Sequence, residues 1–181
     1  MLVKKLTNID LRVSNWIYSK RQKWLTAILI IITNTMDKWL FIPIFGTFLC
    51  FINYANWQFV FVWFWGMVFC AFLFNSILKI IFKRPRPSQS QLVSEKHYSF
   101  PSGHVMTTIQ VSFQSLYLFI QNFQSTIFPY HILVCAILFV LVIAFSRVYL
   151  GVHYVSDTIG SVFFGSISVA ISIFVFQNYI Q

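Results

Sequence analysis

The chain has 181 residues, of which 58% are hydrophobic and only 9% are charged. Soluble globular domains carry about 25% charged residues, so this composition excludes an ordinary soluble domain. The net charge of +9 would suit a nucleic-acid-binding protein, but six of the thirteen basic residues precede the first long apolar run: Lys4, Lys5, Arg12, Lys20, Arg21 and Lys23. That placement is typical of membrane topology signals and of attraction to lipid headgroups. We therefore expect a single membrane-embedded domain over residues 1–181, with no nucleic-acid partner.

Residues 1–23 predict a basic amphipathic helix at the membrane surface. Their apolar residues recur at helical spacing, at Leu6, Ile9, Val13, Trp16 and Ile17. A cleaved signal peptide is the alternative, because a basic region precedes the apolar run 24–32. The following TNTMDK has no small-x-small cleavage site, which favours a retained anchor.

Residues 24–177 predict an all-α, polytopic membrane helical bundle of about six transmembrane helices. One helix over 24–54 would be ~46 Å long at ~1.5 Å per residue, too long for a ~30 Å hydrocarbon core. A polar break at 33–38 divides it. The expected spans are about 24–36, 39–54, 58–82, 104–123, 130–150 and 154–177. Six spans place both termini on one side, so a cytoplasmic basic N-terminus would leave the loop 83–103 and the region 147–153 facing outward.

The side-chain pattern also predicts how the helices pack. Gln110 and Gln114 lie four apart and should point into the bundle. Small residues four apart in the last span suit close packing: Ser156/Gly160, Ser161/Gly165 and Ser168/Ser172. Trp57, Trp63 and Trp65 predict an interface belt. Cys50, Cys70 and Cys135 are expected to be buried and inert.

Ionisable residues near a bilayer core are costly and usually functional, and SRVYLGVHYVSD (146–157) contains three of them. In a helix beginning near Gly151, His153 and Asp157 would lie on one face. A carboxylate on one imidazole nitrogen fixes the tautomer and leaves the other lone pair free to act as a nucleophile or base. The alternative is a helix-end histidine paired with a convenient aspartate.

Two further stretches contain residues suited to binding an anion. In FPSGHV (100–105), Ser102 and Gly103 begin a helix whose backbone N–H groups form an anion site, with His104 beside it as a proton donor. The alternative is an ordinary helix cap. In KIIFKRPRP (79–87), basic residues end a span, and arginine matches phosphate oxygens. Snorkelling anchors are the alternative and suit Lys83 and Arg84, whereas Lys79 lies deeper.

Taken together, Lys79-x6-Arg86-Pro87, Pro101-Ser102-Gly103-His104 and Ser146-Arg147-x5-His153-x3-Asp157 resemble the three motifs of the type 2 phosphatidic acid phosphatase superfamily. The resemblance implies that His153 is a nucleophile forming a phosphohistidine, that Asp157 orients it, and that His104 protonates the leaving oxygen. It implies that the phosphoryl group is bound by Lys79, Arg86, Ser102, the Gly103 amide and Arg147, with Ser146 supporting the pocket. It implies catalysis without a metal or other cofactor.

The resemblance predicts a lipid phosphatase of the inner membrane, with its site facing the periplasm or the outside. Candidate substrates are undecaprenyl pyrophosphate, phosphatidylglycerol phosphate, phosphatidic acid and lipid A phosphates. Two other functions stay open: a lipid phosphotransferase, and a non-catalytic carrier-lipid binder or transporter. The composition argues against the soluble vanadium haloperoxidases of the same fold family, although vanadate should inhibit. The sequence leaves the oligomeric state open.

Other polar residues near the motifs receive no functional role. We expect Glu95 and Lys96 to be a solvated loop pair and His97 a solvated loop histidine. His131 is expected at the interface, and Tyr149 and Tyr154 as packing or interface aromatics.

Overall fold

A computed structural model describes residues 2–37, 57–87, 91–123 and 128–180. Within these residues the regular structure is helical: α1 (Leu2–Ser19), α2 (Lys23–Asp37), α4 (Trp57–Phe82), α5 (Gly103–Phe123), α6 (Phe128–Tyr149) and α7 (Val155–Tyr179). The predicted all-α class is confirmed, and the helix bounds lie close to the predicted spans. The predicted span 39–54 lies outside the described residues.

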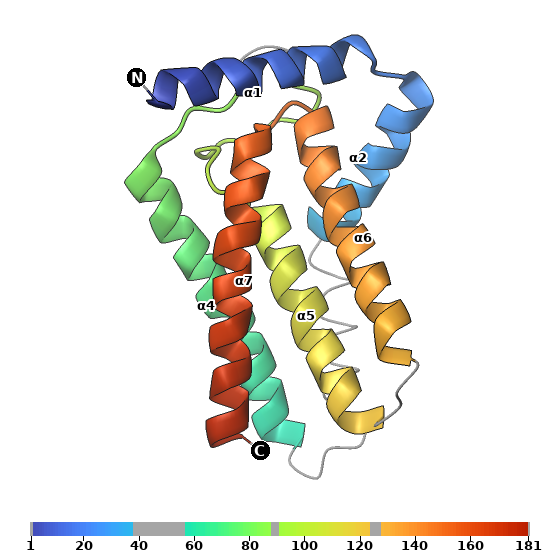
Figure 1. The fold of residues 1–181 in the computed structure, drawn as a ribbon, viewed down its shortest axis with the longest axis vertical. Helices are drawn as coiled ribbons and strands as arrows, with labels where there is room; N and C mark the ends of the chain where they lie inside the picture. The colour runs from blue at the N-terminus through green and yellow to red at the C-terminus, as the bar shows by residue number, and fades with distance from the viewer. Residues whose placement is uncertain (1, 38–56, 88–90, 124–127, 181) are drawn as a thin grey trace.

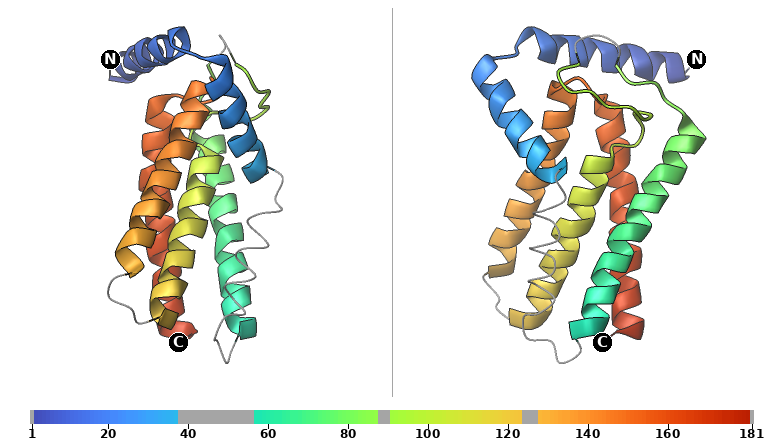
Figure 2. Two further views of the ribbon diagram at one scale, coloured as in Figure 1. Left: turned by 90° about the vertical axis from the view of Figure 1, so that its right-hand side faces the viewer. Right: turned by 180° about the vertical axis from the view of Figure 1, so that it is seen from behind.

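The helices α4, α5, α6 and α7 run along one another, and α1 lies across one end of them (Figure 1). α5 makes the most extensive contacts with other helices, chiefly with α7 and α6 and also with α4. α2 leads away from α1 and packs against α6, as the turned views also show (Figure 2).

The distribution of apolar residues is that of a membrane protein. Three described helices are long and apolar enough to cross a bilayer: Trp57–Phe82, Tyr130–Tyr149 and Val155–Tyr179. Their outward faces carry exposed large hydrophobic residues such as Val62, Leu141 and Phe174. By contrast, Gln110 and Gln114 on α5 are fully buried, as predicted. Because lipid is as apolar as the bundle interior, polar side chains gather where helices meet one another.

The small residues of α7 allow the close approach to α5 that their spacing predicts. Ser161, Gly165 and Ser168 are all buried. A Cβ on Gly165 would lie 3.2 Å from Ile109 of α5, tighter than ordinary contact. The Gln114 Nε2 group donates to Ser172 Oγ at 2.8 Å, which adds a hydrogen bond across the same interface.

Two packing predictions were wrong. Trp63 is buried, and its indole N–H donates to the Ser172 carbonyl at 2.9 Å, because α4 turns this face toward α7 rather than toward an interface belt. Cys70 and Cys135 are exposed on the outer faces of α4 and α6, where a thiol is apolar enough to face lipid. Cys50 lies outside the described residues.

The sequence predicted that the basic N-terminal helix lies at the membrane face opposite the loop after α4 and the region 147–153, and this was wrong. α1 lies at the bundle end that holds the loop after α4 and the α6–α7 turn, whereas α7 finishes at the opposite end (Figure 1). The contacts that hold α1 and the segment after it there are specific: Asp10 accepts from Arg84 at 2.7 Å, and Arg21 donates to the Tyr149 carbonyl. Charge counting does not reveal such pairs.

The face that α1 turns outward is the apolar one. Asp10 is buried against the bundle, while Ile9 and Trp16 are 51% and 66% exposed. An outward apolar stripe with basic neighbours fits the predicted interfacial helix.

Candidate active site

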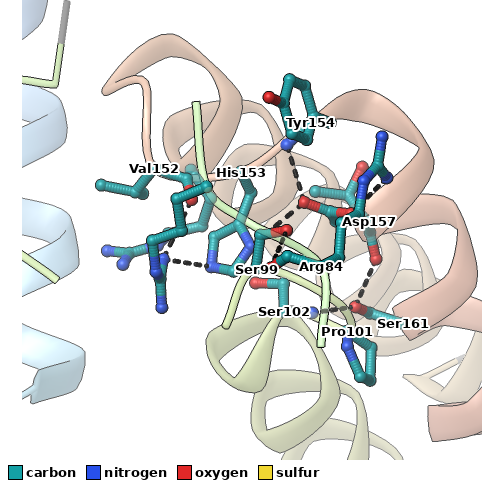
Figure 3. A network of polar contacts seen from close by, with 12 residues as sticks. Arg84, Ser99, Pro101, Ser102, Val152, His153, Tyr154, Asp157 and Ser161 are labelled. Atoms are coloured by element: carbon teal, nitrogen blue, oxygen red, sulfur yellow. Dashed lines mark hydrogen bonds and ion pairs between the residues drawn. The ribbon is translucent and has the colours of Figure 1, made fainter. Parts of the chain in front are cut away.

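The three motif segments meet at the α1 end of the bundle. α4 and α6 finish there, and α5 and α7 begin there, because neighbouring helices run antiparallel. The last turn of α4 with the loop after it, the first turn of α5, and the α6–α7 turn therefore lie together. Figure 3 shows side chains from these segments in one polar network.

The α6–α7 turn sets the position of His153. Gly151 has φ 79°, a left-handed conformation that glycine adopts without a Cβ clash, and it reverses the chain after α6. The amides of Val152 and His153 both donate to the Arg147 carbonyl, at 3.2 and 3.3 Å. α7 begins at Val155, close to the predicted start of the span at 154 and not near Gly151, because the turn occupies residues 150–154.

His153 and Asp157 nevertheless lie side by side. The distance from His153 Nδ1 to Asp157 Oδ2 is 3.6 Å, longer than a hydrogen bond but within ion-pair range. Both side chains are buried. Asp157 Oδ2 also accepts the Tyr154 N–H at 2.9 Å, as a carboxylate does at the start of a helix.

The other ring nitrogen of His153 faces a cation. Arg86 Nη1 lies 3.2 Å from His153 Nε2. A guanidinium only donates hydrogen bonds, so Nε2 accepts, and we assign the ring proton to Nδ1, on the Asp157 side. The Nε2 lone pair therefore points toward Arg86.

His153 is held as the neutral base. Burial lowers the pKa of His153, and the charges of Arg86 and Arg147 lower it further; contact with Asp157 acts in the opposite direction, and the pKa is about 4. At neutral pH the imidazole therefore keeps its lone pair.

The predicted phosphate-binding cations lie around the same point. Arg147 is fully buried in the last turn of α6. Lys79 Nζ donates to the Tyr98 carbonyl at 2.8 Å, and Arg86 donates to the carbonyls of His97 and Val152 at 2.5 and 2.9 Å. A surface hollow of about 510 Å³ opens beside them, and it is lined by Pro85, Arg86, Gln91, Glu95, Lys96, His97 and Tyr98.

The start of α5 completes the group. The Ser102 hydroxyl is buried and has no hydrogen-bond partner among the described residues. The Ser102 amide donates to Ser161 Oγ at 2.7 Å, and Ser161 in turn donates to the Asp157 carbonyl at 2.6 Å. Gly103 packs closely on α4, because a Cβ there would lie 3.3 Å from Asn75 Oδ1. His104 follows at the helix start and is partly exposed.

The residues of all three motifs are thus assembled in one place, and comparison with known proteins agrees. Residues 57–181 match the protein family described as "PAP2 superfamily". The chain belongs to the PAP2 superfamily.

Individual PAP2 relatives resemble different shares of the chain. Phosphatidylglycerophosphatase B of Bacillus subtilis (strain 168) is 39% identical over 90 residues, 49% of this chain and 44% of that protein. This chain thus spans less than half the length of that curated relative. The crystal structure of a transmembrane PAP2-type phosphatidylglycerolphosphate phosphatase from Bacillus subtilis superposes with a TM-score of 0.86 at 26% identity, covering 98% of this chain and 88% of the other. Aquifex aeolicus LpxE shares the fold, with a TM-score of 0.69 at 20% identity over 90% of this chain and 93% of the other.

Two residues that are not signature positions of the PAP2 motifs contact the site, and sequence reasoning missed both. The first is Glu95, which was predicted to be a solvated loop residue. Its carboxylate accepts from Arg147 Nη2 and lies 3.5 Å from Arg86 Nη2. Burial raises the pKa of Glu95, but Arg147, Arg86 and His104 outweigh that effect and lower it, so the carboxylate is ionised. No motif spacing signals this pairing.

The second is Arg84, which was predicted to be a snorkelling anchor. Its Nη1 donates to Asp157 Oδ1 at 2.6 Å, and its Nη2 donates to Asp10 Oδ2 at 2.7 Å. Burial lowers the pKa of Arg84, but the two carboxylates reverse this and raise it. Arg84 therefore points into the bundle end rather than toward headgroups.

The described residues contain no group of three or more His, Cys, Asp or Glu side chains suited to a metal ion. The two carboxylates next to His153 and the cations, Asp157 and Glu95, are both engaged by guanidinium groups. Independence from metal ions stays a prediction, which chelation tests.

Proposed function

We propose that this protein is a membrane lipid phosphatase that removes a phosphate monoester or pyrophosphate group through a phosphohistidine intermediate. One observation carries the proposal: a buried, neutral His153 has Nδ1 beside Asp157 and Nε2 beside Arg86. This is the arrangement that an oriented nitrogen nucleophile next to a phosphate-binding cation requires.

The proposed reaction begins with binding of the phosphoryl group. Its oxygens bind Lys79, Arg86 and Arg147, together with the Ser102 hydroxyl and the Gly103 amide at the start of α5. Arg86 exchanges its hydrogen bond to His153 Nε2 for bonds to these oxygens, which frees the lone pair. Fixed cations beside a helix N-terminus stabilise the charge of the transition state without rearranging.

Two displacements at phosphorus follow. His153 Nε2 attacks phosphorus while the bond to the lipid oxygen breaks, and His104 donates a proton to that oxygen. A water molecule then attacks the phosphohistidine, His104 accepts its proton, and the P–N bond breaks to release phosphate. Asp157 stabilises the positive charge of the phosphorylated imidazole throughout, as a carboxylate does for an imidazolium.

The substrate is proposed to be a lipid, because the site lies at the end of a helical bundle whose outer faces are apolar. Undecaprenyl pyrophosphate, phosphatidylglycerol phosphate, phosphatidic acid and lipid A phosphates all present the same phosphoryl group. Similarity to phosphatidylglycerophosphatase B makes phosphatidylglycerol phosphate the first lipid to test.

Phosphate release from detergent-purified protein tests the proposal. Wild type, His153→Ala and His131→Ala are compared on the lipid panel with EDTA present; His131 is the control because it is exposed near the start of α6, at the end of the bundle opposite the site. We expect release by wild type and His131→Ala, and none by His153→Ala. Product that appears only when a second lipid is added indicates phosphotransfer. A wild type that releases no phosphate but binds the lipid as tightly as His153→Ala does indicates a binder or transporter.

The membrane face that holds the site needs its own test. The basic helix α1 lies at the site end, so the positive-inside bias now favours a cytoplasmic site, opposite to the predicted periplasmic or outer location. The outer location stays a prediction. The test uses Lys96→Cys, at an exposed position, in a protein whose native cysteines are replaced. If an impermeant maleimide labels this cysteine in intact cells, the site faces outward; if labelling requires lysis, the site faces the cytoplasm.

A further inference from the structure

The Asp157 carboxylate is held at both oxygens. Oδ2 accepts the Tyr154 amide at 2.9 Å and faces His153 Nδ1 at 3.6 Å, while Oδ1 accepts from Arg84 at 2.6 Å. The Asp157 side chain is fully buried. With one oxygen bonded to a guanidinium and the other to a backbone amide, the carboxylate plane cannot rotate away from the imidazole.

Arg84 is itself held from several sides. Its Nη2 donates to Asp10 of α1 at 2.7 Å, and its Nη1 also donates to Ser156 Oγ at 2.6 Å. The guanidinium carbon lies 4.3 Å from the centre of the Tyr154 ring. The Ser99 amide donates to the Arg84 carbonyl at 2.9 Å, which fixes the backbone (Figure 3).

Asp10 connects α1 to the same point. One oxygen of its carboxylate accepts the Ser156 amide at 3.0 Å, in the first turn of α7, while the other accepts from Ser156 Oγ and Arg84. Helix α1 therefore contacts both the cation that binds Asp157 and the backbone next to Asp157.

We propose that Arg84, supported by Asp10 of α1, is a positioning residue for the nucleophile: it fixes the Asp157 carboxylate so that Oδ2 stays directed at His153 Nδ1. The proposal rests on the proposed function of His153. It adds two residues that act through Asp157, and it makes the N-terminal helix part of the active-site support.

The chemistry requires arginine at this position. A planar guanidinium spans two carboxylates with separate N–H groups, whereas a lysine ammonium is a point charge that lacks the fork. Without the guanidinium, Asp157 would be a buried carboxylate missing one charge partner, and it would rotate or take up a proton. Either change weakens the orientation of His153.

The first experiment measures steady-state kinetics and orthovanadate affinity in Arg84→Gln. Lys83→Gln is the matched control, because it removes one positive charge at the neighbouring, exposed position. We expect Arg84→Gln to lower kcat about 10- to 100-fold, the range found when a hydrogen-bond partner that orients a metal-binding side chain is removed. KM and vanadate affinity should stay near wild type, because Lys79, Arg86 and Arg147 are untouched, and Lys83→Gln should resemble wild type. An equal loss of vanadate affinity and kcat would make Arg84 a phosphate-site or general structural residue and overturn the proposal.

A double-variant cycle shows whether Arg84 acts through Asp157. In an Asp157→Asn background, Arg84→Gln should have little further effect on kcat, because the group that it positions has already lost its charge. Full additivity of the two losses would contradict the proposal. Asp10→Asn should also lower kcat, by a smaller factor than Arg84→Gln does. It serves as the second variant if Arg84→Gln does not fold.

A spectroscopic readout separates this inference from the proposed function. The ring-nitrogen NMR signal of His153 Nδ1, assigned against His153→Ala, should shift in Arg84→Gln and stay unchanged in Lys83→Gln. If wild type releases no phosphate from any lipid, the proposed function fails, yet a shift confined to Arg84→Gln still supports positioning of Asp157. An unchanged signal in Arg84→Gln overturns the inference, whatever the activity.

Discussion

Arg147 and Glu95 form an ion pair at the point where the three motif segments meet, and Arg86 lies on the other oxygen of the same carboxylate. A carboxylate and a phosphoryl group accept hydrogen bonds from the same guanidinium donors. Glu95 therefore occupies donors of Arg147 and Arg86, two of the three cations that are proposed to bind phosphate, and it lines the same surface hollow as Arg86.

Replacing this carboxylate should strengthen anion binding. In Glu95→Gln, orthovanadate and inorganic phosphate no longer compete with a negative charge, so their inhibition constants should fall about tenfold, the equivalent of one charge-assisted hydrogen bond of ~1.4 kcal/mol. Inhibition titrations measure this, with Lys83→Gln as the control, because Lys83 is exposed and does not line the hollow. A rise in the inhibition constants would show that Glu95 supports the cations rather than competing for them.

The buried imidazole predicts a specific loss of stability in acid. The folded-state pKa of His153 is about 4, below the ordinary 6.5, so protonation favours the unfolded chain. Its contribution to stability is complete above pH 6.5 and is lost between pH 6.5 and about 4, by about 3 kcal/mol over that window. The melting temperature of wild type in detergent should therefore fall more steeply over this range than that of His153→Gln. Parallel curves would refute the lowered pKa.

Ser102 and Ser161 should separate activity from stability. The Ser102 hydroxyl is buried without a partner among the described residues, so Ser102→Ala should leave the melting temperature unchanged or higher while it lowers phosphate release. Ser161 bonds to the Ser102 amide and the Asp157 carbonyl, so Ser161→Ala should cost about 1 kcal/mol of stability. Melting curves and phosphate release on both variants test this contrast. If Ser102→Ala and Ser161→Ala lower the melting temperature equally, the Ser102 hydroxyl stabilises the fold and is not reserved for phosphate.

Replacing each of three glycines by alanine should change the stability of the fold to a different extent. At Gly160 a Cβ would lie 2.4 Å from the Phe100 ring, which requires the ring and its loop to shift, at a cost of about 1–3 kcal/mol. At Gly165 the nearest atom is 3.2 Å away, so the loss should be smaller. At Gly66 nothing lies within 4 Å, and alanine should be neutral or stabilising through its helix propensity. Thermal melts of the three variants should follow this order, and a different order would show that α7 packs differently beneath the loop.

Local sequence predicted the all-α class and the approximate helix bounds correctly, and the reason is physical. Apolar runs as long as 57–82 have few stable conformations other than a helix in lipid, where every backbone polar group needs a partner within the segment. The residues of the PSGH and SRVYLGVH segments require a turn followed by a helix start, and this places Ser102, His104 and His153 at helix ends. Antiparallel neighbours then bring those ends together.

The pairings around the motif residues depend instead on how the helices pack. Arg84 and Asp10 are 74 residues apart, and Arg147 and Glu95 are 52 apart. No periodicity connects such residues, so Arg84 was predicted to be an anchor and Glu95 a solvated side chain. The burial of Trp63 and the position of α1 at the site end have the same origin. The sequence by itself determined which residues carry charge or apolar surface, and the tertiary structure decided which charges neutralise one another, because a buried ion pair forms only where packing excludes water from both partners.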